Sequence, residues 1–201
     1  MEDKKLNEKE SLALITQMIQ NTRRNLDAGS GNIFLVWGYI GVLVTLVVWA
    51  GVYFTKNPIW MWGFWGIPVI GWLLMFVLQR KRQKPVKSYI DKILEHSWKI
   101  FGMVCMMGVL LATDAGRYEV ILPFCIIIMA LGSIITGCII QYTSFFFFPL
   151  MGLVWGMKNL LYGSPLELNS LLWFAGAMIF TMIIPGHILN YKARKEAASR
   201  K

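Results

Sequence analysis

Six long apolar runs constrain the fold of this chain more than any other feature of its sequence. The first run, from Ile33 to Phe54, contains no charged residue. A bilayer core about 30 Å thick needs roughly 20 apolar residues in a spanning helix, and most of the runs have that length. The chain is 56% hydrophobic and 15% charged, whereas soluble domains contain roughly 25% charged residues. We therefore predict an all-α integral membrane protein with spans at about 33–54, 59–78, 98–112, 120–140, 144–162 and 169–189.

The fourth and sixth spans end in similar sequences, ITGCIIQY at 135–142 and IPGHILNY at 184–191, and this similarity would fit three successive helical hairpins. Before the first span, apolar positions recur at spacings of 3 and 4, which is typical of an amphipathic helix over 7–28. These positions are Leu12, Ile15, Ile19, Thr22 and Leu26. A helix this short needs a partner for its apolar stripe, either the bilayer surface, other helices of the bundle or another chain. The sequence thus divides into an amphipathic N-terminal segment (1–31), a six-helix transmembrane domain (32–190) and a basic tail (191–201).

The basic residues fall almost entirely on one side of the predicted bundle. If both termini and residues 79–99 share a side, that side carries 17 of the 20 Lys and Arg residues and the other side carries 3. Asp and Glu divide 8 and 3, so the whole net charge of +9 lies on the first side. The positive-inside rule places this side in the cytoplasm. We therefore expect a multi-pass protein with both termini cytoplasmic.

The densest group of cations lies between the second and third predicted spans. It consists of Arg80, Lys81, Arg82, Lys84 and Lys87. Cations beside a membrane attract anionic lipid headgroups with about 1 kcal/mol each, and the same block would suit a cytoplasmic protein partner or a second copy of the chain. Nucleic acid is not an expected partner, because a folded basic module with base-contacting groups is missing.

His187 and Asn190 form a candidate polar niche near the end of the sixth span. Pro185 frees a backbone carbonyl one turn earlier and Gly186 leaves space, so a polar or metal-binding role is conceivable. However, no second histidine or carboxylate stands three or four residues from His187. An interfacial structural histidine is the favoured interpretation.

Small residues in the spans predict close helix packing. Gly152 and Gly156 form a GxxxG pair, which lets two helix backbones approach. Glycines also alternate with tryptophans in several spans, a pattern that suits either ring-on-glycine packing or a cavity for an apolar ligand. We interpret the three cysteines, Cys105, Cys125 and Cys138, as small apolar packing residues, since they form no CxxC pair.

No motif in the sequence specifies a chemistry. The spans contain no HExxH, GxSxG, P-loop or paired aspartates, so we expect no catalytic residues, cofactor or metal. Charged residues near the span centres, which ion-coupled transporters usually carry, are also missing. The leading hypothesis is a non-enzymatic membrane protein of regulatory or interaction type with a basic cytoplasmic docking face. The alternative is a small permease or a membrane protein that binds lipid or an apolar ligand.

Two short stretches resemble a family. The segment from Leu26 to Gly38 (LDAGSGNIFLVWG) and the segment from Ile184 to Asn190 (IPGHILN) resemble those of a group of uncharacterised small six-span bacterial inner-membrane proteins. The resemblance implies a location in the bacterial cytoplasmic membrane. It implies no activity.

Overall fold

The chain forms a bundle of long helices. A computed structural model describes residues 31–81, 89–162 and 168–198, and these residues contain helices and turns but no strand. The elements, in chain order, are α2 (Asn32–Thr55), η1 (Pro58–Trp65), α3 (Gly66–Lys81), α4 (Tyr89–Asp114), η2 (Tyr118–Val120), α5 (Ile121–Ile140), α6 (Ser144–Tyr162), α7 (Leu168–Met178), η3 (Ile179–Ile183) and α8 (Ile184–Ala198).

Six helical segments are long and apolar enough to cross a membrane, which confirms the all-α prediction and the number of spans. They are Asn32–Thr55, Pro58–Val77, Lys92–Asp114, Tyr118–Ile140, Ser144–Tyr162 and Leu168–Lys195. The third helix begins at Tyr89, well before the expected start near 98, and the last continues to Ala198, beyond the expected end near 189. In both places polar and charged residues with good helix propensity extend the helix past its apolar part. The amphipathic helix predicted over 7–28 lies outside the described residues.

Three of the spans depart from regular α-helix, and the fourth does so only in its first turn, the 3₁₀ helix η2. The second begins as the 3₁₀ helix η1, where the Asn57 side chain accepts a hydrogen bond from the Ile59 backbone N–H at 3.0 Å. A proline in the interior of a helix kinks it, and the second span contains Pro68. This residue lies in the first turn of α3, where a proline costs a helix least. The sixth span contains the π-helix η3 between α7 and α8.

The core of the bundle lies between the first, fourth, fifth and sixth spans. Helix α5 packs closely along α6, and α2 packs along α7 and η3. The largest cluster of buried apolar side chains joins α2, α5 and the sixth span, and contains Val48, Leu122, Ile126, Leu171, Phe174, Met178 and Met182. Since these contacts connect spans from different expected hairpins, the arrangement as three hairpins stays a prediction.

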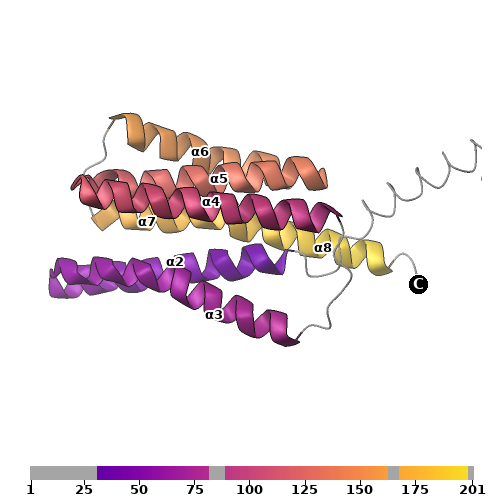
Figure 1. Cartoon of the computed structure of the whole chain (residues 1–201), viewed down its shortest axis with the longest axis horizontal. Helices are drawn as coiled ribbons and strands as arrows, with labels where there is room; N and C mark the ends of the chain where they lie inside the picture. Colours follow the sequence, from indigo (N-terminus) through magenta and orange to yellow (C-terminus); the bar gives the residue numbers. More distant parts are fainter. Residues whose placement is uncertain (1–30, 82–88, 163–167, 199–201) are drawn as a thin grey trace, which may run out of the picture.

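The second and third spans lie at the periphery. Helix α3 packs mainly on α2 and η1, and it diverges from α2 toward its end, while α4 packs mainly on α5 (Figure 1). In the most apolar part of each span, 56% of the residues of the fourth span are buried, against 6% for the second and none for the third. In a bilayer, most of the α3 and α4 surfaces would therefore face lipid or another chain.

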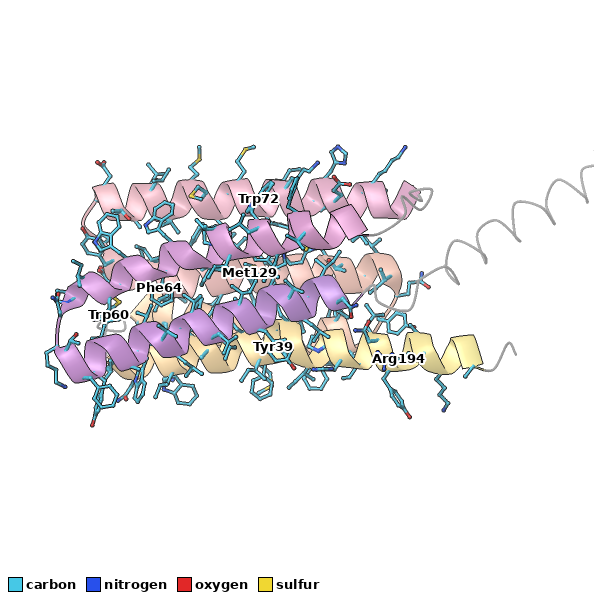
Figure 2. The ribbon with its side chains drawn as sticks, turned by 90° about the horizontal axis from the view of Figure 1, so that it is seen from below. Tyr39, Trp60, Phe64, Trp72, Met129 and Arg194 are labelled. Atoms are coloured by element: carbon cyan, nitrogen blue, oxygen red, sulfur yellow. The ribbon has the colours of Figure 1, made fainter. Side chains whose placement is uncertain are left out.

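The two ends of the bundle differ in charge. We call the end where α2, α4 and α6 begin and where α3, α5 and α8 end the basic end. Among the described residues it carries the exposed cations Lys92, Lys99, Lys192, Arg194 and Lys195. Figure 2 shows Arg194 on α8 at this end and Trp60 near the first turn at the opposite end. The opposite end carries Lys56, Asp114, Arg117, Glu119 and Lys158.

Candidate functional site

The first and last helices are joined by a polar seam at the basic end of the bundle. We define the polar seam as Gly31, Asn32 and Tyr39 on the α2 side and His187 and Asn190 on α8. The chain separates the two sides by about 150 residues, so only the tertiary fold brings them together. The seam contains both residues of the polar niche that the sequence singled out.

Asn190 caps the start of α2 from another helix. Its Oδ1 accepts a hydrogen bond from the Gly31 backbone N–H at 3.1 Å, and its Nδ2 donates to Asn32 Oδ1 at 2.6 Å. The first N–H groups of a helix have no partner within the helix. Gly31 at the N-cap offers no side chain of its own, and the Asn190 carboxamide accepts from the Gly31 N–H, the group that a capping-box Glu or Gln would otherwise satisfy.

Glycines at the seam bring two backbones into contact. A Cβ atom on Gly31 would overlap the carbonyl oxygen of Gly186, and it would also lie 2.8 Å from Asn190 Oδ1. A Cβ on Gly186 would lie 3.0 Å from the Leu35 side chain. Both glycines are buried. The hydrogen bonds of Asn190 thus depend on two positions where no side chain fits.

Tyr39 and His187 form a second link about 10 Å farther along α2, seven residues beyond Asn32. The Tyr39 hydroxyl lies 2.8 Å from His187 Nε2, and the two rings meet edge to face with their centroids 6.1 Å apart. The phenol donates to Nε2 when this nitrogen carries no proton and accepts from it when it does. Tyr39 projects from α2 beside the last span (Figure 2), and both side chains are exposed on the outer surface of the bundle.

The π-helix η3 sets the orientation of α8. Pro185 has no N–H to donate to the carbonyl of Thr181, and just before it the Ile184 N–H bonds to the carbonyl of Ile179, five residues back. One extra residue in a turn rotates everything beyond it by about 100° relative to an unbroken α-helix. This rotation contributes to the placement of His187 and Asn190 beside α2.

The predicted packing pair lies on α6 beside η3 and α5. Gly152 and Gly156 are both buried. A Cβ on Gly152 would overlap the Thr181 side chain, and a Cβ on Gly156 would lie 2.8 Å from Ile127 Cγ1. Thr181 is itself buried, and its hydroxyl donates to the Ala177 carbonyl at 2.9 Å. Gly152 therefore leaves room for the widened turn that carries α8.

The predicted basic contact surface is described only in part. Residues 82–88, with Arg82, Lys84 and Lys87, lie outside the described residues. Arg80 and Lys81 belong to the last turn of α3. The described cations of the basic end are placed more fully: Lys99 pairs with Glu95 at 2.9 Å, and the Lys192 ammonium lies 5.1 Å from the centre of the Tyr142 ring.

Sequence reasoning missed the α2 half of the seam. A search for partners of His187 three or four residues away could not find Tyr39, because this partner is 148 residues away in the chain. A signal was present: Asn32 and Tyr39 are seven residues apart on one helical face, and His187 and Asn190 are three apart on another. Within the described residues no three His, Cys, Asp or Glu side chains are grouped so that they could hold a metal ion.

Comparison of the chain with protein-family models, with curated proteins and with solved structures found no match.

Proposed function

We propose that this chain is a non-enzymatic multi-pass membrane protein of regulatory or interaction type, which contacts anionic headgroups and docks a protein partner at its basic end. The observation that carries the proposal is the Gly31–Asn190 hydrogen bond. Gly31 is the last residue of the N-terminal segment, and Asn190 directly precedes the basic tail. The polar seam therefore brings the residue where the first span begins close to the residue that precedes the tail, both at the basic end.

The cations of the basic end support the proposed contact with anionic headgroups and a protein partner. Lys192, Arg194 and Lys195 are exposed beyond the seam, and the N-terminal segment adds five more Lys and Arg residues. A surface of this sign attracts phosphate-bearing headgroups and acidic protein segments, with about 1 kcal/mol for each cation near an anionic membrane. The apolar stripe of residues 7–28 would supply the sequence-specific part of a protein contact.

The orientation follows from the same charges. We propose that the basic end lies in the cytoplasm of a bacterial cell, that both termini are cytoplasmic and that the six spans insert as three hairpins. Replacing Lys195 by cysteine in a variant without native cysteines gives a direct test. An impermeant maleimide should label position 195 only after the cells are opened, and Lys158→Cys, at the other end, should be labelled in intact cells.

Site-specific photocrosslinking in native membranes tests the docking. A photoreactive residue at Arg194 should form a covalent adduct with a protein, either a partner or a second copy, and the adduct should be lost when residues 7–28 are deleted. The same group at Lys158, exposed at the opposite end, is the matched control and should form no such adduct. Adducts with lipid alone at position 194, or equal protein adducts at both positions, would contradict the docking proposal.

One observation favours the alternative, a protein that binds lipid or an apolar ligand. In the described part of the chain, the Trp49 indole N–H and the Ser133 hydroxyl are buried without a hydrogen-bond partner. Buried polar groups are nearly always paired, so an acceptor group on a bound molecule would satisfy the Ser133 hydroxyl. The alternative predicts a small molecule that co-purifies with the native protein and is lost from Ser133→Ala, as measured by native mass spectrometry.

A further inference from the structure

Helix α4 is attached to the bundle mainly through one neighbour, α5. Rings from one helix lie over glycines of the other: Phe124 lies over Gly108, and Trp98 and Phe101 lie over Gly132, where a Cβ would meet their rings at 3.1 and 3.2 Å. The Trp98 indole N–H also donates to Thr136 Oγ1 at 3.1 Å. The other faces of α4 carry exposed apolar side chains. A change in the α4–α5 contact would therefore change the position of α4 relative to the rest of the bundle.

Two cysteines meet inside this contact. Cys105 on α4 and Cys125 on α5 are 20 residues apart in the chain, and their sulfur atoms lie 3.5 Å apart. Both side chains are partly buried, whereas Cys138, farther along α5, is exposed. The antiparallel packing of α4 and α5 creates the pair. The sequence alone, without a CxxC motif, does not predict it.

The separation is within reach of a covalent bond. A disulfide has an S–S length of about 2.05 Å, so the two sulfurs would have to approach by about 1.5 Å. The two cysteines stand on different helices, so the bond would join elements that are otherwise held by ring packing and a single indole hydrogen bond.

The depth of the cysteine pair in the span determines which oxidants can reach it. Cys105 lies nine residues before the end of α4 at Asp114, which is about 13 Å into the span. An ion entering this depth would lose its hydration at a large cost. An uncharged oxidant that dissolves in the bilayer meets no such barrier.

We propose that Cys105 and Cys125 are a reversible disulfide site that fastens α4 to α5. An uncharged two-electron oxidant, a quinone or hydrogen peroxide, accepts two electrons and two protons. It becomes a hydroquinone or two water molecules. The two S–H bonds break and one Sγ–Sγ bond forms. A dithiol reductant reverses the reaction by thiol–disulfide exchange. The inference does not depend on the proposed docking function.

Counting free thiols tests the site in the full chain, in membranes. The uncharged oxidant diamide is added, the protein is denatured without reduction, and every free thiol is tagged with a large maleimide that shifts the gel band. Wild-type protein should fall from three tags to one, and Cys138→Ala from two tags to none. Cys105→Ala and Cys125→Ala, the matched controls, should keep both tags. Dithiothreitol should restore all tags.

A second oxidant tests the depth of the pair. In Cys138→Ala, the dianion tetrathionate should leave both tags in place at a concentration where diamide removes them. Two outcomes would overturn the proposal: three tags on wild-type protein after diamide, or the loss of tags from Cys105→Ala through pairing of Cys125 with Cys138. Equal oxidation by tetrathionate would overturn the placement of the pair within the apolar layer.

Discussion

Two interfaces of this molecule use different chemistry to hold helices together. At the polar seam, α2 and α8 meet through the Asn190 carboxamide, the Tyr39–His187 pair and a backbone contact at Gly31. At the α4–α5 contact, rings lie over glycines and one indole hydrogen bond crosses between the helices. The first interface joins the first and last spans, whose contacting residues are 159 positions apart at Gly31 and Asn190. The second attaches a peripheral helix to its neighbour in sequence.

The difference shows which interactions determine the stability of each interface. Lipid tails are as apolar as leucine, so burying apolar side chains against each other stabilises helix association little in a bilayer. Close packing and interhelical hydrogen bonds provide the stability instead. The polar seam combines backbone-level packing with several polar groups, whereas in the described part of the α4–α5 contact the indole hydrogen bond of Trp98 accompanies ring packing and two thiols. We expect substitutions at the seam to cost more.

The largest effect is expected at Gly31. In Gly31→Ala the new Cβ overlaps a backbone carbonyl oxygen of Gly186, and neither backbone can move without separating α2 from α8. Overpacking of this kind costs about 1–3 kcal/mol, which should appear as a clear fall of the thermal midpoint in detergent. Gly102→Ala on α4 is the matched control, since a Cβ there meets nothing within 4 Å. If Gly31→Ala had the same thermal midpoint as Gly102→Ala, the backbone contact at Gly31 would not stabilise the polar seam.

The next effect is expected at Asn190. Asn190→Ala deletes the acceptor for the Gly31 N–H and the donor to Asn32, and an unpaired backbone donor costs about 1–3 kcal/mol when it is buried. The part-buried position at a helix start favours the lower half of this range. Asn159→Ala removes only a hydrogen bond within its own helix, to the Trp155 carbonyl at 2.8 Å. The midpoint should fall further for Asn190→Ala, and the reverse order would contradict a trans cap.

A smaller loss is expected at the α4–α5 contact. Trp98→Phe keeps an aromatic ring over Gly132 but removes the indole donor to Thr136, which should cost about 1 kcal/mol. Trp72→Phe on α3 is the control, because its side chain is 72% exposed, and its midpoint should stay unchanged. If Trp98→Phe destabilised the protein more than Gly31→Ala, the ranking of the two interfaces would be wrong.

The sequence predicted the architecture better than the seam, for a physical reason. The length and composition of an apolar run determine whether a helix can span a bilayer, and both are local properties, so the six spans and the all-helical class could be read directly. The Asn190–Gly31 and Cys105–Cys125 contacts depend on which helix faces which. Apolar helices carry little information about that choice, because many faces would pack about equally well. The π-turn before Pro185 added a rotation that no regular helical period predicts.

The smallest effect is expected for the Tyr39–His187 pair. Hydrogen bonds between membrane helices contribute on average about 0.6 kcal/mol, and this pair lies on the outer surface of the bundle, where both groups are exposed. Tyr39→Phe should therefore lower the free energy of unfolding slightly, and a double-mutant cycle with His187→Leu should give a coupling near that value. Tyr191→Phe, 70% exposed on α8, is the control and should show no coupling with His187→Leu. A coupling of zero for Tyr39 would show that the Tyr39–His187 pair does not stabilise the seam. Its stability would then come from Asn190 and the glycines alone. A coupling above about 2 kcal/mol would exceed the range typical of hydrogen bonds between membrane helices, and would contradict the ranking of this pair as the weakest.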